Sequence, residues 1–285
     1  MEVAREVPLP SLQELGGYLP NQRFPSDHLP VVFDLRFRAA GSAGGGSSSD
    51  SAIAGGAANA SGGGGCAGSN VLPAAFYSVP VAVEAVARGE VIAVPTDTIY
   101  GVAACAASAE GVAAVYATKQ REPRKPLAIC VADVADIERY ASISHLAPGL
   151  LEDLLPGPVT LLLPRRSGAP LAEELTAGAE AVGVRIPDNP FLRAVCRQHR
   201  GALALTSANL SGASSSLAVR EFEGLWPACA AVFDGGRLES GRSGSTVVDL
   251  TQPGAFGIVR EGESLDTCCQ LLAEKYGLEK QQPRP

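Results

Sequence analysis

Apolar residues recur with two alternating periods from about residue 74 to the end of the chain. Short, nearly continuous apolar runs such as VIAVPT (91–96) and ALALT (202–206) predict buried strands. Wider spacing predicts helices, as in VAVEAVARG (81–89), which ends at a glycine. Helices are expected near 81–89, 108–119, 134–141, 146–154, 190–200, 217–225 and 264–276, and strands near 91–96, 127–131, 158–164, 181–187, 202–206, 231–235 and 245–250. This alternation predicts one α/β domain over 71–285, with helices covering at least one face of its sheet.

The first 70 residues differ from the rest of the chain in composition. Between 41 and 70, 25 of the 30 residues are Gly, Ser or Ala. Such a segment has too little apolar surface to bury, so we expect 1–70 to be a disordered extension and linker. It contains GGGCAG (63–68), which formally matches a dinucleotide-binding fingerprint. That fingerprint needs a strand before it and a helix after it, and the sequence predicts neither there.

Composition excludes several classes of protein. The net charge is −7, which argues against a protein that coats nucleic acid by charge alone. Since no apolar run approaches the roughly 18 residues that cross a bilayer, no membrane span is expected. Seven cysteines without a CxxC pair fit reduced thiols inside a cell, which favours a cytoplasmic location. Acidic Glu2, Glu6 and Glu14 argue against a mitochondrial transit peptide, although a mitochondrial pool is not excluded.

Small polar side chains follow three of the predicted strands. PTDTIYG (95–101) follows the first strand, TSANLSG (206–212) follows the strand at 202–206, and Arg185 ends a third apolar run. In α/β sheets, ligands bind outside the carboxyl ends of strands, so these segments are candidates for a polar site. Ordinary turn and cap chemistry is the alternative for each segment taken alone.

A basic cluster interrupts this acidic chain. Lys119, Arg121, Arg124 and Lys125 stand against Glu122, which gives +3 within seven residues. One interpretation is a solvated helix end, where cations offset the negative pole of the dipole. The other is a site for polyphosphate, because Arg and Lys bind phosphate oxygens well. No Walker-type GxxxxGK[ST] occurs, so side chains and loops would have to hold a nucleotide.

Hydrolytic and metal-centred mechanisms find little support. The chain has three histidines, His28, His145 and His199, and no GxSxG elbow. Metal-ligating residues do not cluster in the sequence, so no protein-held metal is expected. Magnesium carried in on the phosphates of a nucleotide remains open, because it needs only one or two protein ligands.

Seven motifs, taken in order, resemble the YrdC-like threonylcarbamoyl-AMP synthase family. They are PTDTIYG, KQREPRKPL, PGPVTLLL, VGVRIP, TSANLSG, GSTVVDL and IVREGE, and the resemblance covers roughly 74–265. The pairing of K-x-R (Lys119 and Arg121) with S-x-N (Ser207 and Asn209) is specific to this family. The resemblance implies a single domain with a twisted mixed sheet and flanking helices.

The resemblance also implies an activity. Such enzymes join L-threonine, bicarbonate and ATP, which carries Mg²⁺, into threonylcarbamoyl-AMP and release pyrophosphate. A downstream transferase system then forms threonylcarbamoyladenosine at position 37 of tRNAs that read ANN codons, so no stable nucleic-acid binding is expected. Catalytic roles fall to Lys119 and Arg121. Nucleotide contacts are implied for Lys119, Arg121, Lys125, Ser207, Asn209 and Arg260, and threonine contacts for Thr98, Cys130, Arg185 and Ser245.

Two positions depart from the family pattern. Many relatives carry a histidine where this chain has Cys130, so Cys130 is the least secure member of the implied site. The closing motif is often R-P-G, whereas Arg260, Glu261 and Gly262 stand here. Losing the proline loosens the turn, which makes the placement of Arg260 less certain.

Two rival functions remain at this point. An RNA-binding module could use the same basic pocket without chemistry, but RNA binding requires a broad basic face. A carbamoyl-transfer domain of the same fold could serve a different acceptor. Missing partner domains and the motifs implied to hold threonine argue against this second rival.

Overall fold

The computed structural model describes residues 70–120, 122 and 125–282. All of them lie in the second of the two units into which the chain divides, 65–285. The predicted extension before residue 70 lies outside the described residues, so the domain boundary near 70 stays a prediction. Within the described part, no helix is long and apolar enough to cross a membrane.

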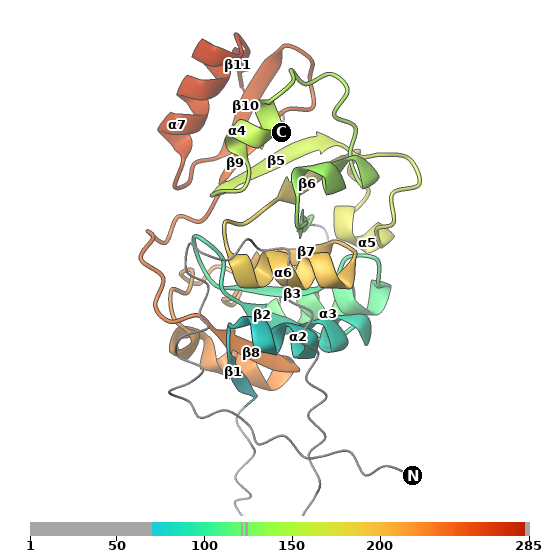
Figure 1. Ribbon diagram of the computed structural model, residues 1–285, viewed down its shortest axis with the longest axis vertical. Helices are drawn as coiled ribbons and strands as arrows, with labels where there is room; N and C mark the ends of the chain where they lie inside the picture. The colour runs from blue at the N-terminus through green and yellow to red at the C-terminus, as the bar shows by residue number, and fades with distance from the viewer. Residues whose placement is uncertain (1–69, 121, 123–124, 283–285) are drawn as a thin grey trace, which may run out of the picture. The chain divides into compact units, whose positions relative to one another are not determined.

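One mixed sheet organises the described residues (Figure 1). Parallel and antiparallel neighbours alternate irregularly; β4, for example, pairs parallel with β6 and antiparallel with β7. The predicted mixed sheet with flanking helices is therefore confirmed. Across this sheet the eleven strands of the described part follow the order β1 (Val71–Pro73), β8 (Ala231–Asp234), β2 (Ile92–Val94), β3 (Gly101–Cys105), β7 (Leu203–Ser207), β4 (Ala128–Cys130), β6 (Ala181–Arg185), β5 (Val159–Pro164), β9 (Thr246–Asp249), β10 (Ala255–Arg260) and β11 (Glu279–Gln281).

The longer helices begin and end at residues that cap them. Ser108 Oγ accepts a hydrogen bond of 2.9 Å from Gly111 N, and Asn189 Oδ1 accepts one of 2.9 Å from Leu192 N. Gly89, with φ of +76°, closes the first long helix. The α-helices are α2 (Val79–Ala87), α3 (Ala109–Lys119), α4 (Leu150–Leu154), α5 (Glu173–Thr176), α6 (Pro190–His199) and α7 (Leu265–Gln270).

Two predicted helices are 3₁₀ segments instead, η2 (Val134–Arg139) and η3 (Val219–Ala228). In η3, Phe222 leaves helical geometry at φ −132° and Pro227 lies inside the segment, so a regular α-helix is interrupted. A further 3₁₀ turn, η1 (Phe76–Ser78), precedes α2, and a π-turn, η4 (Leu271–Lys275), extends α7. The hydrophobic pattern did not predict β1, β3, β10, β11 or α5.

Alternation along the strands divides the core between the two sheet faces. Ala103 and Leu203 point toward one face, where α2 and α6 pack side by side (Figure 1). Val102 and Ala204 point the opposite way, into the larger core beneath α3. Since successive side chains of a strand alternate between faces, each strand contributes to both cores.

The face carrying α2 and α6 changes character toward β6, β5 and β9. There the strands present small or polar residues, including Ala181, Gly183 and Thr160, in place of the large apolar residues on their opposite sides. Small side chains leave a hollow over this part of the face, and the candidate site lies in it.

Candidate active site

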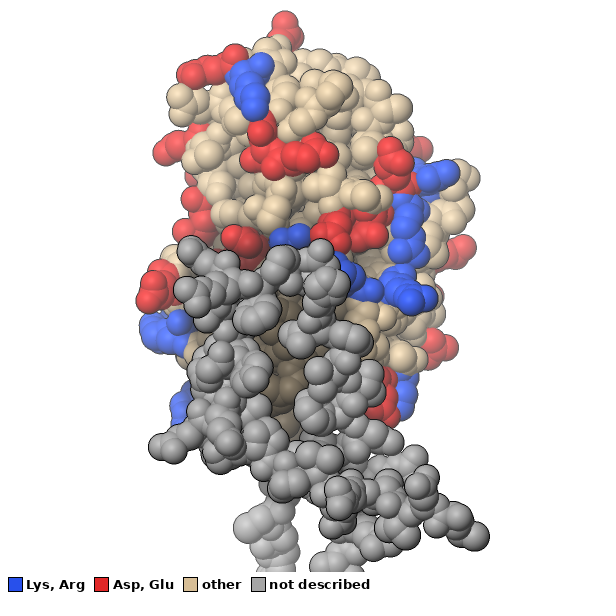
Figure 2. Space-filling model, viewed as in Figure 1, with Lys and Arg blue, Asp and Glu red and all other residues tan. Residues whose placement is uncertain are grey.

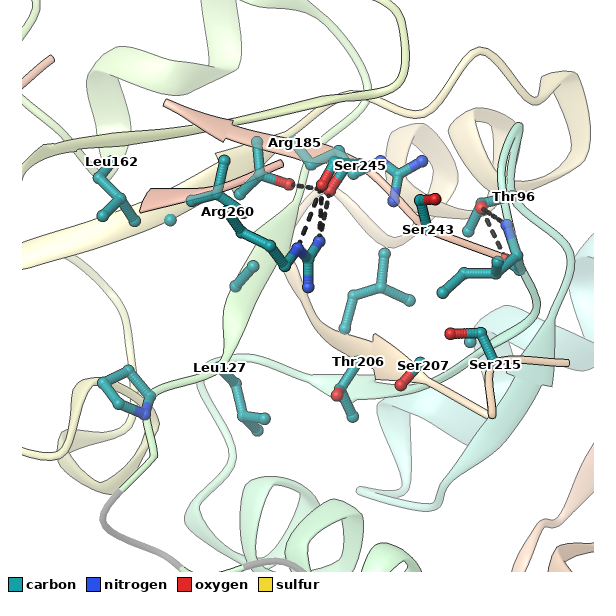
Figure 3. A pocket seen from close by; sticks show the side chains of 18 of the residues that line it. Thr96, Leu127, Leu162, Arg185, Thr206, Ser207, Ser215, Ser243, Ser245 and Arg260 are labelled. Carbon is teal, nitrogen blue, oxygen red and sulfur yellow. Dashed lines mark hydrogen bonds between the residues drawn. The ribbon is translucent and has the colours of Figure 1, made fainter. Parts of the chain in front are cut away.

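A cavity of about 360 Å³ lies over this uncovered part of the sheet. Residues of β3, β7, β4, β6, β5 and β9 line it, and Figure 3 shows many of their side chains. Gly101 is required in this lining, because a Cβ there would lie 2.8 Å from Leu205 Cδ1 and 3.0 Å from Thr206 O. Polar lining residues are Thr96, Tyr100, Thr160, Arg185, Thr206, Ser207, Ser215, Ser243, Ser245 and Arg260.

The segment after β2 forms one wall of the cavity and is internally braced. Thr96 Oγ1 accepts hydrogen bonds from Thr98 N at 3.1 Å and Ile99 N at 3.2 Å. Tyr100 OH donates to Gly236 O at 2.7 Å and accepts from Gly235 N at 2.9 Å, which ties this wall to the loop after β8. Burial raises the pKa of Tyr100 to about 12, so its hydroxyl stays protonated and able to donate.

Arg185 reaches the cavity from the end of β6 and is almost completely buried. Its Nη2 donates to Thr98 Oγ1 at 2.8 Å and forms an ion pair with Asp97 Oδ1. Both partners belong to the segment after β2. The remaining oxygen of that carboxylate, Asp97 Oδ2, and Arg185 Nε are buried without a hydrogen-bond partner among the described residues.

Arg260 and Ser245 also meet at the cavity, and Figure 3 shows Ser245 beside Arg185. Arg260 Nη2 donates to Ser245 O at 2.8 Å and to Ser245 Oγ at 3.0 Å, and Ser245 Oγ lies 2.8 Å from Thr160 Oγ1. Gly262 packs on the same backbone, because a Cβ there would lie 2.4 Å from Ser245 C and Thr246 N. The glycine and these hydrogen bonds locate Arg260 although Glu261 replaces the usual proline.

Lys119, the last residue of α3, is 2% exposed and points its ammonium at the loop after β7. Nζ donates to Ser207 O, to Ser207 Oγ at 3.1 Å and to Asn209 O at 2.8 Å. Ser207 lines the cavity whereas Lys119 does not. Lys119 of the K-x-R motif therefore meets the S-x-N motif, and its charge lies directly behind the cavity wall.

The other residues of the predicted site are placed differently. Lys125 is exposed, and Arg121 lies outside the described residues. Cys130 is fully buried two residues beyond the cavity floor, with its Sγ 3.3 Å from Cys196 Sγ of α6. The hydrogen bond between Cys196 and Cys130, together with burial, raises the pKa of the Cys196 thiol well above its usual value. The structure therefore gathers Thr98, Arg185, Ser207, Ser245, Asn209, Lys119 and Arg260 in and behind the cavity walls, and leaves Cys130 beneath α6.

The expected arrangement at the carboxyl ends of strands is wrong in one respect. β6 runs antiparallel to β7, so the carboxyl ends of these two strands point in opposite directions. Arg185 nevertheless meets Thr98, because the segment after β2 folds back over the sheet face. The site consequently lies over the face rather than at one edge.

Sequence reasoning missed several lining residues, among them Thr160 of β5, Ser215 and Ser243. Thr160 lies between the buried Val159 and Leu161, so the alternation along the strand indicated that Thr160 lies on the face opposite the main core. Sequence reasoning also assigned Asp97 no role in the site. No local sequence signal connects Asp97 with Arg185, which lies 88 residues away.

The lining chemistry suits an anionic ligand. Two guanidinium groups, Arg185 and Arg260, face a wall of hydroxyls, and the described lining residues include no His, Cys, Asp, Glu or Lys. No group of three or more His, Cys, Asp or Glu side chains in the described part could hold a metal ion. The fold and the site thus define an α/β protein with a cavity over the face of a mixed sheet that is suited to a small, polar, anionic molecule.

Comparison with known proteins makes the assignment more specific. The model of the Sua5/YciO/YrdC family, described as telomere recombination, matches residues 84–262. The chain belongs to this family.

Its relatives include the threonylcarbamoyl-AMP synthases of Homo sapiens and Bos taurus, each 48% identical over 202 residues. The match covers 69% of this chain and 71% or 72% of theirs. Among solved structures, Sua5 of P. abyssi complexed with L-threonine is 26% identical, with a TM-score of 0.64. That similarity covers 72% of this chain and 59% of the P. abyssi chain.

Proposed function

We propose that this protein is an L-threonylcarbamoyladenylate synthase, a nucleotidyltransferase. It joins L-threonine, bicarbonate and ATP into threonylcarbamoyl-AMP and releases pyrophosphate. The observation that carries the proposal is one cavity, walled by Arg185 and Arg260 with clustered hydroxyls, in a chain 48% identical to a protein named for this activity. The product serves tRNA modification, the formation of threonylcarbamoyladenosine at position 37.

The wall around Arg185 is the proposed threonine side. A guanidinium is the natural partner of a carboxylate, and Thr98 Oγ1 holds Arg185 Nη2 at 2.8 Å. Thr160, on the strand that pairs with β6, and Ser245 supply further hydroxyls, 2.8 Å apart. The threonine complex of the P. abyssi relative supports this assignment.

The Lys119 and Arg260 side is the proposed ATP site. A carboxylate oxygen of N-carboxythreonine attacks the α-phosphate of ATP. A P–O bond forms there, and the bond between the α-phosphate and pyrophosphate breaks. Several negative charges then lie within a few Å of one another, where repulsion is worth several kcal/mol. Fixed cations offset this charge: Arg260 from the cavity wall, Lys119 from behind Ser207, and magnesium carried in with ATP.

Catalysis in this proposal rests on positioning. The described lining residues provide no side chain suited to covalent catalysis by a thiol, imidazole or carboxylate. Holding carboxythreonine in line with the α-phosphate can itself supply a large part of the rate enhancement. Rigid walls serve this purpose, and both walls of the cavity are internally hydrogen-bonded.

The decisive experiment measures pyrophosphate release from ATP while threonine or bicarbonate is left out in turn. The proposal expects release only when all three substrates are present, with threonylcarbamoyl-AMP identified by mass spectrometry. Release that does not depend on threonine would refute the assignment.

An RNA-binding module is the second candidate carried by the basic cluster. On the face shown in Figure 2, a few blue side chains gather along the right-hand side, and red side chains lie beside them and over the rest of the described surface. This distribution favours a small anion over a long one. Salt-sensitive RNA binding combined with no pyrophosphate release would reverse the choice.

A further inference from the structure

The loop between β7 and η3 borders the proposed ATP side of the cavity. It contributes Ser215 to the lining. The next residue, Ser216, donates from Oγ to Ala208 O at 2.7 Å, inside the S-x-N motif. Because Lys119 reaches the cavity wall through that same motif, this loop packs on the side proposed to hold the nucleotide.

The loop between β8 and β9 borders the same side. It contributes Ser243 to the lining, and a Cβ on Gly244 would lie 3.7 Å from Arg260 Nη2, so the loop packs next to that guanidinium. Earlier in this loop, Ser240 Oγ donates to Thr98 O. The loop therefore contacts both the ATP side and the segment after β2.

Glu221 of η3 ties these two loops together. Its Oε2 accepts from Leu217 N, in the first loop, at 3.0 Å and from Arg242 Nη1, in the second, at 2.7 Å. Its Oε1 accepts from Arg242 Nη2 at 3.1 Å and from Arg237 Nη1 at 3.2 Å. Arg242 Nη1 also donates to Ser215 O. One carboxylate and one bidentate guanidinium thus fix the spacing between the two loops.

The exposure of this link separates its effect on position from its effect on stability. The side chains of Glu221 and Arg242 are 27% and 44% exposed, and ion pairs this accessible to water contribute little to stability. The hydrogen bonds from Arg242 lower the pKa of Glu221 to about 2, so the link persists at neutral pH. A loop that is already fixed costs less entropy when a ligand binds against it.

We propose that Glu221 is a positioning residue for ATP, which acts through Arg242 by holding the two loops that bring Ser215 and Ser243 to the cavity. This inference rests on the proposed function and deepens it. Threonine should depend on Glu221 much less, because Thr98 Oγ1 braces Arg185 through a contact of its own.

The test measures pyrophosphate release by the full chain, as wild type and as Glu221→Ala, with ATP and threonine titrated in turn. The KM for ATP should rise about tenfold, because ATP must then order both loops as it binds. The KM for threonine should change less than about threefold, since Ser240 links only one loop to Thr98. A merely structural role would lower the amount of active protein and leave both KM values unchanged.

Glu223→Ala serves as the matched control. Glu223 lies in the same segment, η3, and forms an exposed ion pair with Arg220 at 3.8 Å. This variant should keep both KM values within a factor of about two of the wild type. Arg242→Ala and the double variant of Glu221 and Arg242 test the route. If Glu221 acts through Arg242, the single variant should raise the KM for ATP similarly, and the double variant no further.

Each outcome has a definite consequence. If the KM for ATP stays within a factor of about two in Glu221→Ala, the inference fails while the proposed function stands. Equal rises for ATP and threonine also overturn it, because Glu221 would then support the cavity as a whole. Effects that add in the double variant show that Glu221 does not act through Arg242. A wild type that releases no pyrophosphate refutes the proposed function, and the inference falls with it.

Discussion

Two arginine–aspartate clusters in this protein have opposite characters. Asp133, at the start of η2, accepts from Arg197 Nη2 at 2.8 Å, Arg197 Nε at 3.0 Å and Arg193 Nη2 at 2.9 Å. The Asp133 and Arg197 side chains are 44% and 55% exposed. Asp97 and Arg185 are at most 10% exposed, and each retains an unpartnered polar atom among the described residues.

The contrast separates a structural contact from a site. Water can solvate the exposed cluster, and both carboxylate oxygens of Asp133 already accept hydrogen bonds. The cluster therefore links η2 to α6 and needs no additional partner. Such surface pairs contribute little to stability. The buried pair carries a desolvation cost that its own hydrogen bonds do not offset. Arg185 of the buried pair lines the candidate site, whereas no residue of the exposed cluster does.

The largest effect is expected at Lys119, which is buried like Arg185. Lys119→Met should lower the rate of pyrophosphate release about 10²–10³-fold, because a fixed charge beside the reacting phosphates is lost and the loop after β7 loses its anchor. Steady-state kinetics with saturating threonine measures the effect. Lys280→Met, at an exposed position of β11, is the matched control and should retain full activity. Equal activity of the two variants would remove Lys119 from the site.

Arg185→Ala tests the buried side of the comparison directly. It leaves Asp97 as an uncompensated buried charge, so we expect a loss of about 3–5 kcal/mol in the free energy of unfolding. In the folded fraction, the requirement for threonine should rise far more than that for ATP. Urea unfolding and substrate titrations measure both effects. The double variant Arg185→Met with Asp97→Leu should recover stability but not threonine binding; if it recovers neither, the stability argument is wrong.

The sequence predicted much of this fold because hydrophobic period and capping residues act locally. VIAVPT and PVTLLLP became β2 and β5, and Ser108 caps α3 as predicted. The prediction failed where local pattern was weak, at the partly exposed β10 and the exposed β11. It also failed where neighbours decide the conformation, as in the interrupted η3.

The site was predictable as a set of residues but not as a geometry. Motif order identified Arg185, Ser207 and Arg260, all of which line the cavity. The pairing of Arg185 with Asp97 depends on strand order and on a segment folding back over the sheet, and neither can be read from spacing. Cys130, assigned because many relatives carry a histidine at this position, likewise lies under α6.

Cys130 and Arg185 sharpen the comparison further, because they are partners in register on neighbouring strands. Arg185 reaches the cavity, whereas Cys130 packs against Cys196. Cys130→Ala should therefore cost about 1 kcal/mol of stability, similar to losing one methyl group, and leave threonine affinity unchanged. Thermal unfolding and calorimetry provide the two measurements. A clear loss of threonine affinity would place Cys130 in the site after all.

Asp133→Asn, on the exposed side of the comparison, should have the smallest effect, below about 1 kcal/mol at pH 7 and none on synthase activity. The hydrogen bonds from Arg197, followed by those from Arg193, lower the pKa of Asp133 in the folded protein. A lowered folded-state pKa means that this contribution is complete above the unfolded value, near 3.9, and is lost as pH falls through the folded value. Because asparagine does not titrate, the difference in stability between wild type and variant should persist from pH 7 to about pH 4 and then shrink. Urea unfolding at pH 7, 5 and 3 follows this trend. If the variant instead loses several kcal/mol at pH 7, the difference in exposure does not distinguish the two clusters, and the comparison fails.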